Sequence, residues 1–301
     1  MEVGGVQTRK NCLKMISEPE LWLSPQRVLG ELGLRPLRQL GQNFMVDRGV
    51  LRSICQKADL NPGEPVVEIG PGTGALSQYL LAQGAQLLCV ELDRGLAGYL
   101  GDAYKEKGLS LVHGDILAKK TSIHKDVLEW AEGHAKAGVK PKWISNLPYN
   151  ILTPFLWNLL KVPHLWSSGV FLVQKEFIDR LKAMPGDPNY GPLSVMSHLH
   201  LEVEMVRKVA KGCFWPPPDV ESAVLAVRPI PGEIFEHDRF VDFLKRAFSQ
   251  RRKVMSKVLN HWVQKDRLRD ELESMGLAVD VRAEKLSPEE LLQLFKKLIQ
   301  T

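Results

Sequence analysis

A short corner, Asn146-Leu147-Pro148-Tyr149, follows an apolar strand-like run and contains residue types that can hold a flat substrate. The side-chain oxygen of Asn146 and the main-chain carbonyl of Leu147 can each accept a hydrogen bond from an exocyclic amino group, while Pro148 fixes the turn through its locked φ. Tyr149 offers a ring on which a base can stack, worth about 1–3 kcal/mol per base. The residue types of the corner therefore suit the holding of a flat base by its amino group, with a proline turn over a core tyrosine as the alternative.

A glycine-rich turn lies upstream of this corner. The segment VVEIGPGTGALS (66–77) runs from an apolar, β-branched stretch through Gly70, Gly72 and Gly74 into a helix-like stretch. Glycines at such a turn let the backbone bend tightly and approach a ligand. Glu91 and Asp115 end the next two apolar runs, where they can accept hydrogen bonds from ribose hydroxyls and an adenine amino group. Each acid taken singly also fits a helix cap, but together with the glycines they predict a nucleoside site.

The spacing of the glycines bears on the kind of nucleoside. A dinucleotide such as NAD places its pyrophosphate at a helix N-terminus and suits G-x-G-x-x-G. Here the third glycine comes one residue early, giving E-x-G-x-G-x-G led by Glu68, which resembles the class I S-adenosylmethionine methyltransferases. The glycine loop alone does not separate the two cofactors. An NAD-dependent dehydrogenase would, however, leave the corner at 146–149 unexplained, and no residue stands out for hydride transfer.

Alternating elements are predicted to position these residues. Apolar runs near 64–70, 85–93, 109–115, 141–146 and 168–176 are separated by helix-length segments, and two further runs at 200–209 and 221–229 flank a proline-rich loop. This pattern favours an α/β fold with a mostly parallel, seven-stranded Rossmann-like sheet and helices on both faces. We expect a loosely ordered extension over 1–22, a ligand-binding domain over 23–230 that opens with a helix capped by Ser24, and a small helical domain over 231–301.

Composition sets broader limits. Lys and Arg number 40 against 35 Asp and Glu, so the net charge of +5 permits a polyanionic partner without requiring one. The four cysteines are scattered without a CxxC pair, which indicates a reducing compartment and predicts no metal site. No apolar run approaches the roughly 20 residues of a membrane helix. We expect a cytoplasmic protein without membrane attachment, with an organellar matrix as the less favoured alternative.

In its motifs the chain resembles one family, the ribosomal RNA adenine dimethyltransferases of the KsgA type. The resemblance extends from about Ser24 to about Leu259 and preserves the family order of motifs. The motifs are LGQNFMVD, VVEIGPGTGALS, ELD, GDIL, NLPYNI, VQKEFIDRL, YGPLSVM, FWPPPDVESAV and FSQRRK. Departures from the pattern are Met45 in place of the usual Leu, a longer connection over 118–141 that predicts an added surface helix, and the first twenty residues, which have no counterpart.

The resemblance implies S-adenosylmethionine as the cofactor. Residue 43 and the backbone of residue 45 would close over it, residue 91 would hold the ribose, residue 115 the adenine, and residue 146 would face the reacting methyl group. The implied cofactor contacts are Asn43, Met45, Gly70, Gly72, Glu91, Asp115 and Asn146. The implied catalytic set is Asn146, Leu147, Pro148, Tyr149 and Phe214. Phe214 would stack the target adenine opposite Tyr149, with a core phenylalanine beneath a loop as the alternative.

By the same resemblance, the substrate is a pair of adjacent adenines in a hairpin loop near the 3′ end of small-subunit (16S) rRNA. Each adenine would receive two methyl groups at N6 within a pre-ribosomal particle, and the protein would work as a monomer. Loop bases are already partly unstacked, so turning one into a pocket requires less free energy than opening a duplex. A large-subunit rRNA methyltransferase of the antibiotic-resistance type and a non-enzymatic nucleic-acid-binding factor on the same fold are the alternatives.

A basic segment near the C-terminus is the predicted RNA contact. Residues 239–260 have a helical apolar stripe, with cationic side chains mostly off it. The stripe contains Phe240, Phe243, Leu244, Ala247, Phe248, Val254, Met255 and Val258. The resemblance assigns phosphate contacts to Arg246, Arg251, Arg252 and Lys253, with a solvated charged face as the alternative. Arg251 interrupts the stripe, which a purely structural helix would avoid.

Overall fold

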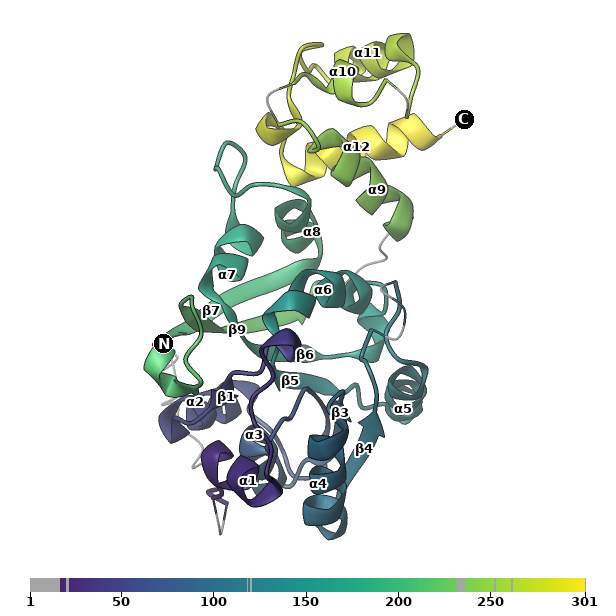
Figure 1. The fold of residues 1–301 in the computed structure, drawn as a ribbon. Helices are drawn as coiled ribbons and strands as arrows, with labels where there is room; N and C mark the ends of the chain where they lie inside the picture. The colour runs from purple at the N-terminus through teal and green to yellow at the C-terminus, as the bar shows by residue number, and fades with distance from the viewer. Residues whose placement is uncertain are drawn as a thin grey trace, which may run out of the picture.

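The computed structural model describes residues 17–19, 22–117, 119, 121–231, 236–251, 253–260 and 262–300, without the side chain of Arg38. Its centre is a seven-stranded sheet in the order β4-β3-β2-β5-β6-β9-β7, in which only β9 runs antiparallel to its neighbours (Figure 1). The strands are β2 (Pro65–Ile69), β3 (Gln86–Glu91), β4 (Leu109–His113), β5 (Lys142–Asn146), β6 (Ser168–Gln174), β7 (Leu201–Val209) and β9 (Ser222–Pro229). The predicted fold class is confirmed.

The central parallel strands β2, β3, β5 and β6 are buried on both faces, whereas the edge strand β4 is partly exposed. Along β2, β3 and β5, successive side chains alternate between two hydrophobic clusters, as in the pairs Val66/Val67, Leu87/Leu88 and Ile144/Trp143. One cluster lies against α2, α3 and α4, and the other against α5, α6, α7 and α8. A strand that faces helices on both sides must be apolar throughout, which explains the near-continuous apolar runs in the sequence.

Three of the helices before β4 begin at capping residues that the sequence places there. Ser24 accepts a hydrogen bond from the amide of Arg27, and Pro25 occupies the first position of the first helix, as predicted. Asp47 and Asp93 cap α2 and α4 in the same way. The helices are α1 (Pro25–Leu32), α2 (Arg48–Ala58), α3 (Ala75–Ala82), α4 (Arg94–Tyr104), α5 (Lys125–Lys136), α6 (Leu152–Leu160), α7 (Lys175–Lys182) and α8 (Pro192–His200). Helix α5 is the added helix predicted for the 118–141 connection.

Two segments far apart in sequence form a small second sheet beside the main one. β1 (Phe44–Met45) pairs antiparallel with β8 (Phe214–Trp215), placing Met45 opposite Phe214. β8 belongs to the proline-rich loop between β7 and β9, which pair antiparallel as predicted. Through this pairing, the loop supports the N-terminal segment that crosses the carboxyl ends of the parallel strands.

The C-terminal residues form α9 (His237–Ala247), α10 (Met255–Val258), α11 (Lys265–Ser274) and α12 (Pro288–Ile299), which gather at one end of the molecule next to α8 (Figure 1). The apolar stripe predicts one helix through residue 258, and this is wrong, because α9 ends at Ala247 and a turn precedes α10. One buried cluster continues from the main sheet into these helices. The domain boundary near 231 remains a prediction, because the residues on its two sides share this buried core.

The predicted loose extension also differs from the structure. Among its described residues, Glu18 forms ion pairs with Arg48 and Arg52 of α2, and Trp22 packs against the cluster between α2, α3 and the sheet. Because these contacts join the extension to two helices, residues 17–19 and 22 are part of the fold.

Candidate active site

A cavity opens at the carboxyl ends of the central strands, where the chain leaves β2 toward β3 on one side and returns to β5 on the other. Ligands of doubly wound folds bind at such a switch point. The cavity brings together all of the predicted cofactor residues and most of the predicted catalytic ones: Asn43, Met45, Gly70, Gly72, Glu91, Asp115, Asn146, Leu147, Pro148 and Tyr149. Residues separated by more than a hundred positions thus line one space.

The corner after β5 is held from several sides. Asn146 donates through Nδ2 to the carbonyl oxygen of Asn43 at 3.0 Å, and the amide of Leu147 donates to Leu172 of β6 at 3.2 Å. The hydroxyls of Tyr149 and Ser222 are 2.6 Å apart, so the ring of Tyr149 is fixed at its far end. Since the nitrogen of the Asn146 amide is used inside the protein, its oxygen remains as an acceptor for a ligand in the cavity.

The glycine loop after β2 has the backbone shape that glycine favours. Gly70, Gly72 and Gly74 have φ values of +61°, +59° and +78°. A Cβ atom on Gly72 would lie 2.8 Å from Cε1 of Phe44, so this glycine also allows the N-terminal segment to pack directly on the loop. The cavity wall therefore depends on a position without a side chain.

The two acids have different surroundings. Glu91 is 5% exposed, and its carboxylate accepts hydrogen bonds from the amides of Gly72 and Asp93, both at 2.9 Å. Burial raises the pKa of Glu91 above its usual value, and the two amides partly offset that effect. Asp115 is exposed, accepts from the amide of Leu117 at 2.8 Å within a turn, and lines the cavity. The helix-cap alternative is wrong for both acids, because Asp93 caps α4 and no helix begins directly after Asp115. Both acids can thus serve the local backbone and a ligand.

The donors and acceptors fit the nucleoside part of S-adenosylmethionine. Ionised carboxylates accept from hydroxyl and amino groups, which that ligand carries, and the cavity contains no cluster of cations for a pyrophosphate. Thr73, which was not predicted from the sequence, also supports a bound ligand. Its buried Oγ1 lines the cavity without a hydrogen-bond partner among the described residues. A buried hydroxyl without a partner is unfavourable, so a ligand atom would satisfy it.

Glu68, the first residue of the glycine motif, is 1% exposed and lines the cavity floor. Its carboxyl accepts a hydrogen bond from Ser77 at 2.6 Å, but burial dominates and raises its pKa to about 8. At neutral pH this carboxyl is therefore mostly protonated. Burial thus raises the pKa of both Glu68 and Glu91, and for Glu91 two backbone amides partly offset that effect.

We expect the Glu68→Gln variant to change how stability depends on pH. The folded pKa of Glu68 lies above the unfolded value of 4.5, so the folded state binds more protons between these values and the free energy of unfolding falls as pH rises from about 4.5 to 8. Glutamine does not titrate. The stability difference, variant minus wild type, should rise by up to about 1.4 kcal/mol per pH unit in this window, measured by denaturant unfolding from pH 5 to 8. A difference that stays constant with pH would contradict the assignment.

Phe214 is the predicted catalytic residue that the structure does not bring to the cavity. It is 3% exposed, lies opposite Met45 in the small sheet and packs in the cluster between α2, α3 and the main sheet. In this structure the ring thus packs as the core alternative predicts, and its stacking on the target adenine remains a prediction.

Arg251 also needs correction as a predicted phosphate contact. Its guanidinium donates to the carbonyls of Asp187, Pro188 and Tyr190 at 3.0, 2.8 and 2.7 Å and to Glu284 at 3.4 Å. Four of its five N–H groups thus have acceptors within the protein. This explains why Arg251 interrupts the apolar stripe: it joins the α7–α8 loop to the C-terminal helices.

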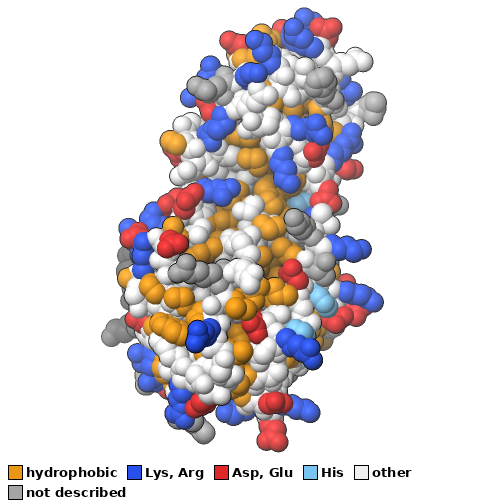
Figure 2. Space-filling model, in the orientation of Figure 1, with side chains coloured by type: hydrophobic (Ala, Val, Ile, Leu, Met, Phe, Trp, Pro, Cys, Tyr) orange, Lys and Arg blue, Asp and Glu red, His pale blue; other side chains and the backbone are white. Residues whose placement is uncertain are grey.

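The other predicted RNA contacts remain predictions. Arg246 is exposed and pairs with Asp242 at 2.8 Å on the same helix, Lys253 is exposed, and Arg252 lies outside the described residues. Figure 2 shows Lys and Arg side chains spread over the C-terminal end of this face, with Asp and Glu among them. The surface in this view has no block of a single charge.

We expect Arg251→Ala to act on stability and leave the electrostatics of RNA binding unchanged. Loss of the guanidinium removes a donor from the carbonyls of Pro188 and Tyr190, while the Asp187 carbonyl keeps the amide of Tyr190 at 3.1 Å. This loss should lower the free energy of unfolding by about 1–3 kcal/mol. Arg246→Ala removes only an exposed pair worth about 0.2–1 kcal/mol and is the matched control. If Arg251 were a phosphate contact, its removal would lower the slope of log K against log salt by about one, which titration with rRNA at several salt concentrations would detect.

The fold and the site define a Rossmann-like methyltransferase. Its seven-stranded sheet is flanked by helices, and at the switch point two acids that can bind a nucleoside lie beside a polar corner. The ribosomal RNA adenine dimethylase family model matches residues 35–300, and the chain belongs to this family. A small-subunit rRNA methyltransferase A from Geobacter sulfurreducens is 38% identical over 275 residues, covering 89% of this chain and 96% of the relative.

Solved structures agree with the family. A dimethyladenosine transferase from Plasmodium falciparum has a TM-score of 0.68 at 25% identity, covering 83% of this chain and 95% of that one. The 23S rRNA methyltransferase ErmE has a TM-score of 0.58 at 25% identity, covering 86% and 100%. In the part of the chain that the structure describes, no helix is long and apolar enough to cross a membrane. The same residues contain no group of three or more side chains arranged to hold a metal ion.

Proposed function

We propose that this protein transfers methyl groups from S-adenosylmethionine to the N6 amino groups of two adjacent adenines in a 3′-terminal hairpin loop of small-subunit rRNA, giving dimethyladenosines. The observation that carries the proposal is the locked amide of Asn146, whose nitrogen bonds to Asn43 and whose oxygen is left to accept from a substrate. The cavity beside it has the acids that a nucleoside cofactor needs.

The residues of the corner account for the difficult part of this reaction. The lone pair of an adenine amino group is delocalised into the ring, which makes the nitrogen a poor nucleophile. Hydrogen bonds to the Asn146 side-chain oxygen and the Leu147 carbonyl favour a pyramidal nitrogen, and Tyr149 holds the base by stacking. The cofactor supplies an electrophilic methyl group on its sulfonium. Glu91 and Asp115 orient the cofactor, and the substrate proton leaves to solvent after transfer.

The relatives support the small subunit as the substrate. Curated proteins named small-subunit methyltransferase A match 89% of this chain at 34–38% identity, whereas the large-subunit enzyme ErmE is similar in fold at 25% identity. By the same resemblance, we propose that the protein acts alone on a pre-ribosomal particle in the cytoplasm. A non-enzymatic factor is disfavoured because the glycine loop and the corner are both intact.

The proposal is tested with labelled S-adenosylmethionine and two purified substrates. Undermethylated small subunits and large subunits are incubated separately with the protein, and their RNA is digested for mass analysis. We expect dimethyladenosine at adjacent positions near the 3′ end of the small-subunit rRNA and no label in the large subunit. Label only in the large subunit would favour the resistance-type reaction. Cofactor binding without any transfer would favour the non-enzymatic factor.

A further inference from the structure

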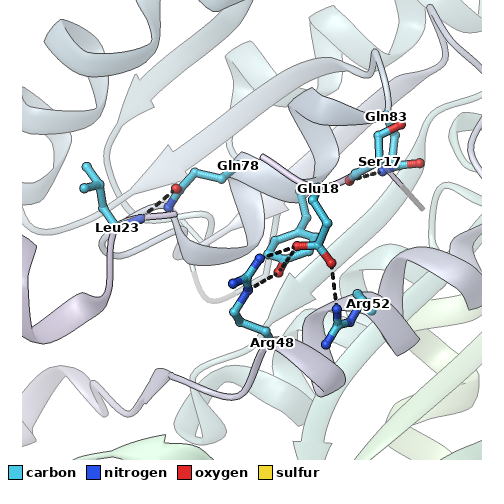
Figure 3. Close-up of polar contacts among 8 residues, drawn as sticks. Ser17, Glu18, Leu23, Arg48, Arg52, Gln78 and Gln83 are labelled. Atoms are coloured by element: carbon cyan, nitrogen blue, oxygen red, sulfur yellow. Dashed lines mark hydrogen bonds and ion pairs between the residues drawn. The ribbon is translucent and has the colours of Figure 1, made fainter. Parts of the chain in front are cut away.

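We call a set of N-terminal residues the anchor and define it as Ser17, Glu18, Trp22 and Leu23. Ser17, Glu18 and Leu23 bond to side chains of α3 and its C-cap (Figure 3), and Trp22 lies against Arg48 of α2. The carbonyl of Ser17 accepts from Gln83 Nε2 at 2.9 Å, just past the C-terminal end of α3. The amide of Leu23 donates to Gln78 Oε1 at 3.2 Å, nearer the start of that helix. The anchor thus spans α3, and it precedes the residues that the family model matches, 35–300.

Glu18 is the centre of this contact. Its carboxylate accepts from Arg48 at 2.6 Å, from Arg52 at 2.8 Å and from the hydroxyl of Tyr79 at 2.8 Å (Figure 3). Arg48 also donates to Tyr79 at 3.0 Å and lies over the ring of Trp22, 5.8 Å from its centroid. Isolated exposed ion pairs contribute little, but here one carboxylate joins α2, α3 and the N-terminal segment at a single point.

The anchor contacts the chain on both sides of one short segment that lines the cavity. Residues 40–45, which we call the cover, line the cavity and lie between α1 and α2 in the chain. On the upstream side, Leu23 leads into α1 and bonds to Gln78, whose Nε2 donates at 3.1 Å to the carbonyl of Gly74 in the glycine loop. On the downstream side, Arg48 opens α2 three residues after Met45 and bonds to Glu18.

The cover itself makes contacts on which the reaction depends. The carbonyl of Asn43 orients the amide of Asn146, and Phe44 packs on Gly72 where no side chain intervenes. Gln42 donates to Asp93 at 3.4 Å, and Asp93 in turn donates its amide to Glu91. A shift of the cover would therefore disturb both the corner and the cofactor acid.

We infer that Glu18 is a positioning residue for cofactor binding: through Arg48, Arg52 and Tyr79 it keeps the cover docked over the cavity before the cofactor binds. The inference rests on the proposed cofactor. A cover that is already in place does not have to be ordered when the cofactor arrives, so the apparent affinity approaches the intrinsic affinity of the closed form. Without Glu18 the closed form is a smaller fraction of the free protein, and the apparent affinity falls by that fraction.

The test compares Glu18→Ala with Glu31→Ala in the full chain. Glu31 pairs only locally with Arg27 on α1 at 2.8 Å, with both side chains more than half exposed, so it is a matched acidic control in the same region. Binding of S-adenosylmethionine and S-adenosylhomocysteine is measured by calorimetry at 25 °C, and methyl transfer is measured at saturating cofactor. Glu18→Gln, which keeps an acceptor but removes the charge, is the conservative variant.

We expect Glu18→Ala to weaken binding of both ligands by about 3- to 10-fold, with Glu18→Gln in between and Glu31→Ala within about twofold of wild type. The rate at saturating cofactor should be unchanged, because the cover is then closed by the ligand. Equal affinities for Glu18→Ala and wild type, or a loss confined to the saturated rate, would overturn the inference. Cofactor affinity is measured without RNA, so a wrong substrate assignment would leave this result unaffected.

Discussion

Replacing Asn146 with alanine should reduce methyl transfer by a factor on the order of 100 to 1000 while cofactor affinity falls less than about tenfold. Loss of one oriented acceptor at a reacting centre has an effect of that size when the acceptor acts mainly in the transition state. The cofactor loses one of its several predicted contacts, together with the support that the Asn146–Asn43 hydrogen bond gives to the cavity wall. Single-turnover transfer to undermethylated small subunits measures the rate, and calorimetry measures the affinity.

The Asn146→Asp variant separates geometry from chemistry. Aspartate has the same shape, but its second oxygen would face the Asn43 carbonyl oxygen where Nδ2 now donates at 3.0 Å. Two acceptors facing each other repel, so the side chain should turn and the rate should remain low. Asn189→Ala, an exposed amide in the α7–α8 loop, is the control and should retain wild-type turnover. A rate within tenfold of wild type for Asn146→Ala would show that the corner is structural.

Most residues of the cavity can be predicted from local sequence motifs. The motifs are the glycines of the loop, the acids at successive strand ends and the proline corner, and each is explained by the backbone conformation it needs. The alternation of strands and helices brings the strand ends to one edge of the sheet. Glu91 and Asp115 accept hydrogen bonds from backbone amides in loops and line the cavity, and neither of them caps a helix. For these residues, local chemistry and fold topology point to the same place.

Other features depend on contacts that no local pattern encodes. Phe214 turns into the core because β8 pairs with β1, which lies some 170 positions earlier in the chain. In the sequence, Arg251 is one cation of a basic cluster. Its contact with the α7–α8 loop becomes apparent only in the structure. The anchor resembles an unstructured extension because Glu18 finds its partners on two helices that the sequence places later. Long-range pairing of single polar side chains has no periodicity from which to predict it.

Replacing Gly72 with alanine should weaken cofactor binding by a factor on the order of 100. Gly72 has φ of +59°, a conformation that costs an alanine about 1–2 kcal/mol. Its new Cβ would also lie 2.8 Å from Cε1 of Phe44, so the ring must move and the cavity wall with it. The amide of Gly72 donates to Glu91 at 2.9 Å, so the displacement reaches the carboxylate predicted to hold the ribose. Calorimetric titration with S-adenosylmethionine measures the loss.

Two further variants divide that loss into strain and overlap. The strain at Gly70 is similar, with φ of +61°, but its Cβ would meet Pro148 at an ordinary 3.6 Å, so Gly70→Ala should lose less affinity than Gly72→Ala. Adding Phe44→Leu to Gly72→Ala removes the ring edge and should recover part of the affinity, giving a coupling between the two sites. Gly98→Ala, exposed on α4 with open space around it, should leave binding unchanged. Strictly additive effects of Gly72→Ala and Phe44→Leu would mean that the cover does not rest on the glycine loop when the cofactor is bound.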